Sequence, residues 1–263
     1  MSDPIAAPKP LAQCGALVVG GSAGIGYASA LKLGLAGVPR LVISARDPGR
    51  GEAARARLAD ATGADVVFVS ADVTRADEAV RLVDEAERVL GGIDILVCST
   101  VAVATPELFK DIPLTGIQGI VTEMLMPPMQ MVSAVMPGMR ERRGGVIITV
   151  ASDAGKTATP GEAIIGACKA AIIMFTRTIA MEGKRDGVRA NVLTPSLVHG
   201  TASTERITSE GFSAKLFERA AAQAHLGVPT ADDLGDLVAF LAGPGAARLT
   251  GQAISVNGGI SAA

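Results

Sequence analysis

The chain has 263 residues, of which 49% are hydrophobic and 19% charged, and its formal net charge is -2 at pH 7. This composition excludes a disordered protein, and the small net charge gives no reason to expect nucleic acid or an anionic membrane as partner. No apolar run reaches the roughly 18 residues that a membrane span needs. The N-terminus lacks the form of a signal peptide and the three cysteines lack metal-ligand spacing. We therefore expect a cytoplasmic protein with reduced thiols and no metal site.

Residues 1–12 are expected to form a flexible tail, and residues 13–263 a single domain without repeats. In that domain, short apolar runs alternate with helical patterns. The long helical pattern at 116–140 is expected to be interrupted by Pro127-Pro128, and residues 196–224 to form a loop with helical pieces. The expected strands are 17–19, 41–44, 66–70, 93–98, 146–150, 188–193 and 253–256, and the other expected helices are 28–35, 51–61, 76–90, 162–182 and 231–241.

Apolar strands that alternate with helices predict an α/β fold whose strands are parallel and covered on both faces. The number of strand patterns indicates a doubly wound sheet of about seven strands. In such sheets, ligands bind beyond the carboxyl ends of the strands.

A glycine-rich turn follows the first expected strand, where Gly20, Gly24 and Gly26 have the spacing GxxxGxG. A strand that turns sharply into a helix leaves the first N–H groups of that helix unpaired, and they form a ready anion site. Glycine also allows a pyrophosphate to approach the backbone closely. The alternative is an ordinary tight turn, but the strand before it and the helix after it favour a dinucleotide site.

Further motifs agree with this interpretation. They are Gly20-x-x-x-Gly24-Ile25-Gly26, Asp72-Val73, Asp94-Ile95-Leu96-Val97, Ser152, Lys169, Asn191 with Pro195, and the ending Thr250-Gly251-Gln252 through Asn257-Gly258-Gly259. Together they resemble the short-chain dehydrogenase/reductase family over nearly the whole chain. The resemblance implies a Rossmann-type sheet and an NAD(P)(H)-dependent oxidoreductase. The segments 141–154 and 161–169 look most like the alicyclic hydroxyacyl-CoA dehydrogenases of that family, which implies a cyclic or CoA-linked hydroxyl or carbonyl substrate.

The resemblance also implies how the cofactor is bound. Asp72 would hydrogen-bond the adenine, and the residues that end the second strand would select the cofactor. Ala45 stands at the usual acid position and Arg46 follows it, which favours NADP(H) over NAD(H) because arginine can bind a 2′-phosphate. The alternative is a solvated arginine in a loop with Asp47. The full set of expected cofactor-binding residues is Gly20, Ser22, Gly24, Ile25, Gly26, Arg46, Asp72, Val73, Lys169, Pro195 and Val198.

The family's catalytic set is a tyrosine that transfers the proton, a serine that holds the substrate oxygen, and a lysine four residues after the tyrosine. The lysine lowers the phenol pKa and binds the nicotinamide ribose. Here Lys169 and Ser152 fit this spacing, but Ile165 stands at the tyrosine position. Isoleucine cannot carry a proton, and the only tyrosine of the chain, Tyr27, lies just beyond the glycine turn.

Other parts of the family pattern are also changed. Met124 stands at the position of the relay asparagine, and Cys98-Ser99-Thr100-Val101 replaces an asparagine-rich segment. Asp153, Glu162 and His199 lie near the site in the sequence and are candidate substitutes for the missing base. The unperturbed pKa of histidine, about 6.5, suits the task best, but a loop histidine is more often solvated. Glu162 is expected to start a helix and Asp153 to cap a turn.

Two functions therefore remain open. The first is an NADP(H)-linked oxidoreductase with an unusual proton donor. The second is a catalytically silent pseudoenzyme that binds nucleotide or supports an active relative. Under either, the resemblance implies assembly through the two long helices and the last strand, as a homo-tetramer or dimer or as a hetero-oligomer with an active relative.

Overall fold

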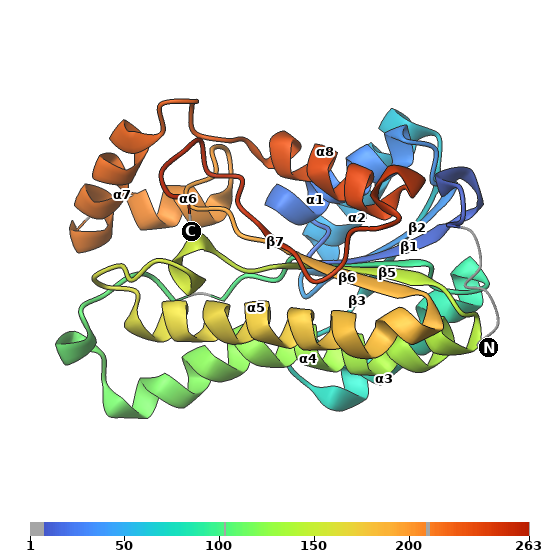
Figure 1. Ribbon diagram of the computed structural model, residues 1–263, viewed down its shortest axis with the longest axis horizontal. Helices are drawn as coiled ribbons and strands as arrows, with labels where there is room; N and C mark the ends of the chain where they lie inside the picture. Colours follow the sequence, from blue (N-terminus) through green and yellow to red (C-terminus); the bar gives the residue numbers. More distant parts are fainter. Residues whose placement is uncertain (1–7, 103, 209–210, 263) are drawn as a thin grey trace.

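In the computed structural model, which describes residues 8–102, 104–208 and 211–262, one parallel sheet of seven strands has helices on both faces (Figure 1). The strand order is β3-β2-β1-β4-β5-β6-β7. The order reverses between β1 and β4, which confirms the predicted doubly wound, Rossmann-type sheet. The strands are β1 (Gly15–Val19), β2 (Arg40–Ala45), β3 (Asp65–Ser70), β4 (Ile95–Cys98), β5 (Gly145–Val150), β6 (Val188–Leu193) and β7 (Ala253–Ile254).

Two hydrophobic clusters cover the two faces of the sheet. Alternate residues of one strand point to opposite faces, so Ala16 and Val18 join one cluster and Leu17 and Val19 the other. The first cluster packs against α1 (Gly24–Leu35), α2 (Pro48–Thr62) and α8 (Ala231–Ala242). The second packs against α3 (Ala76–Leu90), α4 (Ile117–Glu141) and α5 (Ala163–Gly183). Burial on both faces explains why the strands are apolar throughout.

The expected interruption of the long helix at Pro127-Pro128 is wrong. Helix α4 runs without a break through both prolines and through Pro137. Each proline removes an N–H group from the helical hydrogen bonds, but Pro127 and Pro128 are buried, and Met131 and Met139 of the same helix are fully buried in the core. Tertiary packing therefore outweighs the local preference of the sequence.

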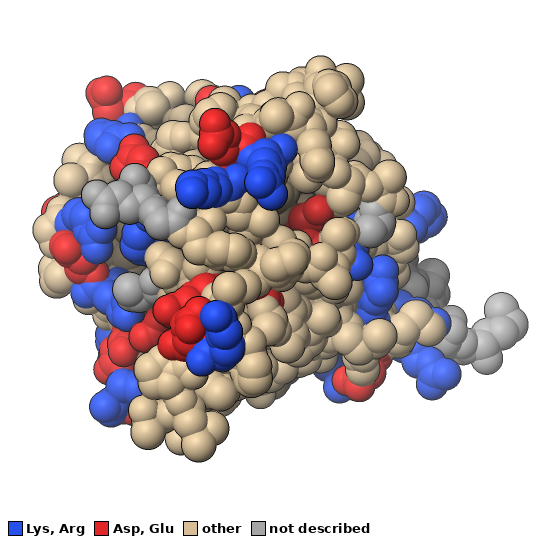
Figure 2. Space-filling view, turned by 90° about the vertical axis from the view of Figure 1, so that its left-hand side faces the viewer, with Lys and Arg blue, Asp and Glu red and all other residues tan. Residues whose placement is uncertain are grey.

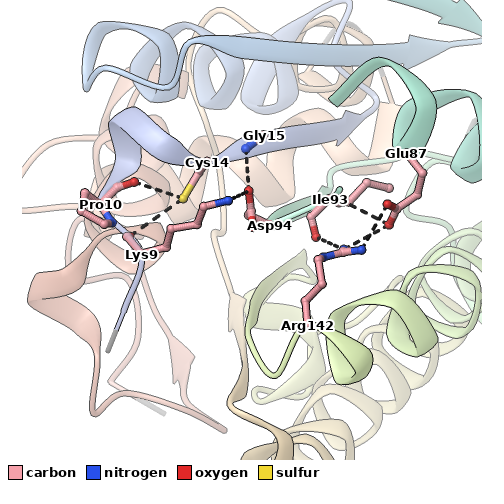
Figure 3. A network of polar contacts seen from close by, with 8 residues as sticks. All are labelled: Lys9, Pro10, Cys14, Gly15, Glu87, Ile93, Asp94 and Arg142. Atoms are coloured by element: carbon pink, nitrogen blue, oxygen red, sulfur yellow. Dashed lines mark hydrogen bonds and ion pairs between the residues drawn. The ribbon is translucent and has the colours of Figure 1, made fainter. Parts of the chain in front are cut away.

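The described part of the expected tail makes contacts with the domain. Residues 1–7 of the expected tail lie outside the described residues, but Lys9 forms an ion pair with Asp94 at 2.8 Å, and Leu11–Gln13 forms a short 3-10 helix. The same carboxylate oxygen of Asp94 also accepts the backbone N–H of Gly15 at 2.8 Å, which fixes the start of β1 (Figure 3). Among the described residues of the expected tail, Lys9 and Leu11–Gln13 are thus held by contacts and by local structure.

A second polar contact in the same region joins two helix ends (Figure 3). The guanidinium of Arg142, just after α4, donates to Glu87 of α3 at 3.1 Å and to the carbonyl oxygen of Ile93 at 3.0 Å.

The thiol of Cys14, close to Lys9 and Pro10, is buried, and burial raises its pKa to about 11. Cys14 is therefore an unreactive packing residue.

Residues 196–224 contain two helices, as the expected loop with helical pieces implied. They are α6 (Ala202–Thr208) and α7 (Gly211–Gln223). Both lie at one end of the molecule, beyond the sheet (Figure 1). They cover the carboxyl end of the strands, where the predicted site lies.

Candidate functional site

A cavity of about 780 Å³ lies at the carboxyl ends of the strands. It extends from the glycine turn after β1 to helix α7, and every strand from β1 to β6 contributes a residue at or just after its end. Those residues are Val19, Ala45, Ala71, Ser99, Val150 and Pro195. Its place at the point where the strand order reverses is the place where doubly wound sheets bind ligands.

The glycine turn forms one wall of this cavity. Gly20 has a φ of 83°, and a Cβ there would lie 2.4 Å from the carbonyl oxygen of Ser99. Helix α1 begins at Gly24, and no side chain caps its first N–H groups. Gly20, Ser22, Gly24 and Ile25 all line the cavity. These free donors fit a pyrophosphate, because a helix N-terminus attracts an anion.

Gly26 has a different role from the one expected. It does not line the cavity, but a Cβ at this position would lie 2.1 Å from the carbonyl oxygen of Gly20. Gly26 therefore allows the first turn of α1 to pack closely on the glycine turn.

The end of β2 brings arginines to the same wall. Arg46 is exposed, lines the cavity, and has no ion pair among the described residues. Asp47 caps α2 by accepting the backbone N–H of Arg50 at 2.9 Å, and the Arg50 guanidinium lies 3.1 Å from the other carboxylate oxygen. Hydrogen bonding to Arg50 also holds the pKa of Asp47 below its usual value. The Asp47 charge is thus already paired, which leaves Arg46 for an incoming anion.

Further residues of the expected cofactor set line the same cavity. Asp72 accepts the hydroxyl of Thr74 at 2.8 Å through one carboxylate oxygen. The hydroxyl of Ser44 is buried and has no hydrogen-bond partner among the described residues, which is unusual unless a ligand completes the site. The remaining expected residues on the lining are Val73, Lys169, Pro195 and Val198.

The cavity lining also includes Ser152, Ile165 and Lys169. The turn after β5 packs tightly on α5: a Cβ on Gly155 would lie 2.7 Å from the carbonyl carbon of Lys169, and one on Gly166 would lie 2.8 Å from the carbonyl oxygen of Ala154. Two elements far apart in the sequence are thus locked together. The structure therefore brings together the residues that the sequence spacing predicted.

The surroundings of Ile165, the position that the sequence resemblance assigns to the tyrosine, are apolar. Ile165 packs in a small cluster with Met124, Ile164 and Cys168. Met124, which the sequence resemblance assigns to the position of the relay asparagine, is buried and also lines the cavity. This part of the wall can exclude water from a reacting carbon, but it cannot transfer a proton.

Lys169 is the only lysine on the cavity lining among the described residues. Burial lowers its pKa to about 8, and Cys168 and Glu162 partly oppose this shift. No ion pair or hydrogen bond holds its ammonium group among the described residues. Such a lysine has donors available for hydroxyl groups of a bound ligand.

Two of the three candidate bases line the cavity. Glu162 is the N-cap residue of α5, as expected for a residue that starts this helix. Burial raises the pKa of its carboxyl group, while a hydrogen bond from Thr159 works in the opposite direction. Asp153 is buried and accepts the hydroxyl of Ser261 at 2.7 Å. Asp153 does not cap the turn, since the side chain of Ser152 does so by accepting the N–H of Ala154 at 3.2 Å.

The third candidate, His199, lies elsewhere. It is exposed and does not line the cavity. Its backbone N–H donates to the carbonyl oxygen of Pro229 at 2.8 Å, and the residue pairs with Thr230 as an isolated bridge. The position of His199 therefore argues against its role as the base.

One part of the cavity wall was not predicted from the sequence. Helices α6 and α7 supply part of it, and the hydroxyl of Ser261 comes from the C-terminal segment. The missed residues are Thr201, Thr204, Arg206, Ile207, Leu216, Phe217, Arg219, Ala220, Gln223, Ile260 and Ser261. The spacing of Leu216, Phe217 and Ala220 on one helical face was a usable signal, but nothing local marks Ser261.

The guanidinium of Arg206 also donates to the carbonyl oxygen of Ala102 at 3.2 Å, which connects α6 to the loop after β4.

Figure 2 shows the end of the molecule where α6 and α7 lie. Among the described residues on this face, small groups of basic side chains lie next to small groups of acidic ones, with no broad band of one sign. The face thus lacks the basic stripe that is typical of a nucleic-acid interface.

Comparisons with known proteins agree with this geometry. The family model described as "Enoyl-(Acyl carrier protein) reductase" matches residues 19–261. A 3-oxoacyl-[acyl-carrier-protein] reductase of Synechocystis sp. is 32% identical, and the match covers 93% of this chain and 96% of the relative. An acetoacetyl-CoA reductase of Shinella zoogloeoides is 30% identical, with 93% and 97% covered. A solved structure described as a short chain dehydrogenase/reductase family protein is 30% identical, has a TM-score of 0.82, and is matched over 94% of this chain and 96% of that chain.

Proposed function

Because the chain belongs to the short-chain dehydrogenase/reductase family, we propose that it is an NADP(H)-dependent oxidoreductase that interconverts a hydroxyl and a carbonyl group. One observation carries this proposal: a single cavity joins the glycine turn and Arg46 to Ser152 and Lys169. The nucleotide end and the reaction centre are thus parts of one site.

The residues of the cavity have separate tasks in this proposal. When bound, the nicotinamide cofactor supplies or accepts the hydride. The free N–H groups at the start of α1 bind the pyrophosphate, and Arg46 binds the 2′-phosphate. Lys169 donates to the hydroxyls of the nicotinamide ribose. The hydroxyl of Ser152 donates to the substrate oxygen and stabilises the negative charge that develops there.

The proposed substrate is a small acyl thioester that carries a 3-oxo or hydroxyl group. The named relatives are reductases of 3-oxoacyl-[acyl-carrier-protein] and of acetoacetyl-CoA, and the sequence resemblance to the alicyclic hydroxyacyl-CoA dehydrogenases also implies a CoA-linked substrate. The apolar wall of Ala102, Met124 and Ile165 suits the acyl part.

Turnover tests this proposal. The purified chain is incubated with NADPH and acetoacetyl-CoA, and the loss of NADPH absorbance is followed against a sample without substrate. We expect saturable oxidation of NADPH. If NADPH binds but neither acetoacetyl-CoA nor a cyclic acyl-CoA is reduced or oxidised, the oxidoreductase proposal is wrong.

That negative outcome would support the second candidate, a pseudoenzyme that binds nucleotide or supports an active relative. The observation that favours it is the apolar cluster that contains Ile165 and Met124. The resemblance assigns these two positions to the polar tyrosine and asparagine of the family. A catalytically active partner chain, whose activity rises when this chain is added, would establish that role.

We also propose that the protein assembles through the outer face of α4 and α5. Met129, Met136 and Phe175 line a shallow apolar groove between these helices. Met174 and Met181, which are both 60% exposed, lie one after the other along α5. Apolar surface of this kind on a soluble chain indicates an interface, and a twofold axis would bring two copies of it together. A dimer or tetramer is the proposed state.

One segment of the described residues, Ala163–Asp186, is long and apolar enough to cross a membrane by length and composition alone, with a mean hydropathy of 1.6. Core helices of soluble proteins pass the same criterion. This segment consists of α5 and the short 3-10 helix Lys184–Asp186 that follows it, and α5 packs on the sheet and on α4. A cytoplasmic location therefore stays our proposal.

A further inference from the structure

We propose that Glu162 takes the place of the missing tyrosine and donates a proton to the substrate oxygen during carbonyl reduction, or accepts that proton during alcohol oxidation. The inference rests on the proposed oxidoreductase function and assigns its proton donor. Four observations carry it: the helical register, the fixed backbone, the cavity wall and the polar surroundings of this carboxyl group.

The helical register places Glu162 beside the catalytic centre. Glu162 is the N-cap residue of α5, and Ile165 and Lys169 follow it at i+3 and i+7, in the first two turns of the helix. All three line the cavity. Glu162 therefore lines the same cavity as the position predicted for the tyrosine, about one helical turn away along the chain.

The backbone around Glu162 is fixed. Its N–H donates to the carbonyl oxygen of Thr159 at 3.1 Å, and its carbonyl oxygen accepts the N–H of Gly166 at 2.5 Å. Gly161 has a φ of 87°, and a Cβ at that position would lie 2.4 Å from the ring of Phe212 in α7. The side chain thus starts from a well-defined point, as a proton donor requires.

The surroundings keep a proton on this carboxyl group. Burial favours the uncharged acid and raises the pKa of Glu162, and the charge of Asp153 acts in the same direction. The hydrogen bond from Thr159 and the ammonium of Lys169 oppose this effect. A raised pKa brings a glutamate closer to the pH at which an acid can both hold and release a proton.

The other titratable groups on this part of the wall have other tasks. Asp153 accepts the hydroxyl of Ser261. Lys169 lies one helical turn after Ile165 along α5 and is assigned to the hydroxyls of the nicotinamide ribose. During reduction, the carbonyl carbon receives the hydride and the π electron pair of the C=O bond moves to the oxygen. That oxygen takes the proton from the Glu162 carboxyl group, and the resulting carboxylate recovers a proton from solvent.

The first test compares Glu162→Gln with Glu182→Gln in the NADPH and acetoacetyl-CoA assay. Glutamine keeps the shape but cannot transfer a proton, so we expect kcat to fall by about 10²–10⁴-fold while NADPH affinity is kept. The wild-type reduction rate should fall as pH rises through the Glu162 pKa, and this limb should disappear in Glu162→Gln. Glu182 is exposed near the other end of α5, and its variant should match the wild type.

The second test uses rescue and a measurement without turnover. Adding Ile165→Tyr to Glu162→Gln supplies a phenol at the family position and should recover part of the lost kcat. In addition, a raised pKa means that Glu162 contributes stability at acid pH that is lost as pH rises through that pKa. Denaturant unfolding of the cofactor-free protein should show this loss in the wild type and not in Glu162→Gln.

The outcomes separate the two proposals. If the wild type turns over and Glu162→Gln keeps its rate and its pH limb, Glu162 is not the proton donor, although the oxidoreductase function stands. If instead the pH at which the reduction rate falls is shifted in Lys169→Arg, the lysine is the proton donor. If the wild type shows no turnover, both the function and this assignment are wrong.

Discussion

At the scale of single residues, spacing carried most of the information about the centre of the site. The lysine and the serine could be predicted because their distances along the chain, four and thirteen residues from position 165, reflect a helical turn and the turn after β5. The contact between Asp153 and Ser261 spans 108 residues. No local pattern encodes it, so the sequence could not predict it. His199 was misplaced for the same reason, since proximity in the sequence did not bring it to the cavity.

Lys169 gives a prediction at this scale. Burial lowers its pKa to about 8 from the ordinary lysine value of 10.5, so the folded protein binds this proton less tightly than the unfolded chain. Stability should therefore rise with pH between about 8 and 10.5. Lys169→Met should remove this rise, stabilise the cofactor-free protein at pH 7, and weaken NADPH binding.

Denaturant unfolding at pH 7 and at higher pH, with calorimetry for NADPH, checks this expectation. Lys184→Met is the matched control, because Lys184 is exposed just after α5. A Lys169→Met protein that is less stable than the wild type at pH 7 would contradict the account of this lysine.

At the scale of elements, sequence patterns predicted helices whose ends have local signals. The pattern at 76–90 matched α3 in full, because charged residues alternate with a buried apolar face and Gly91 ends the helix in the left-handed conformation. The pattern failed for α4. Local rules correctly identify Pro127 and Pro128 as helix breakers, but burial of this helix against the sheet, α3 and α5 outweighs them.

The glycine turn gives the prediction for this scale. Gly26→Ala places a Cβ where the carbonyl oxygen of Gly20 lies, so the first turn of α1 must move. We expect NADPH affinity to fall by at least tenfold and the protein to lose stability.

Gly119→Ala is the matched control. Gly119 is an exposed residue of α4 with no atom near the added Cβ. Alanine is a better helix former there by about 1 kcal/mol, so this variant should be slightly more stable and bind NADPH normally. Equal NADPH affinity in the two variants would be inconsistent with the close packing proposed for the turn.

At the scale of the whole molecule, the alternation of strands and helices predicted the architecture because a parallel sheet requires crossover helices on both faces. Such patterns could not predict the part of the cavity wall that α6 and α7 form, because it depends on how these helices pack over the ends of the strands. The outer face of α5 raises a similar question: only 33% of its most apolar window is buried within one chain. A second copy is the proposed cover.

Assembly is tested by Met174→Glu, which places a charge on the exposed apolar face of α5. Burying an unpaired charge in an interface is costly, so the variant should shift from a dimer or tetramer to smaller species in sedimentation equilibrium. Val80→Glu is the control, because Val80 is 53% exposed on α3, away from the groove. Identical masses for wild type and Met174→Glu would place the interface elsewhere.

The central claim is that this chain keeps a site for a phosphorylated redox dinucleotide although it lacks the family tyrosine. Calorimetric titration of the purified protein with NADPH and then with NADH tests it most directly, with Arg46→Ala as the variant at the end of β2. We predict saturable binding of one NADPH per chain, at least tenfold tighter than NADH, and a loss of this preference in Arg46→Ala. No measurable binding of either coenzyme would contradict the claim.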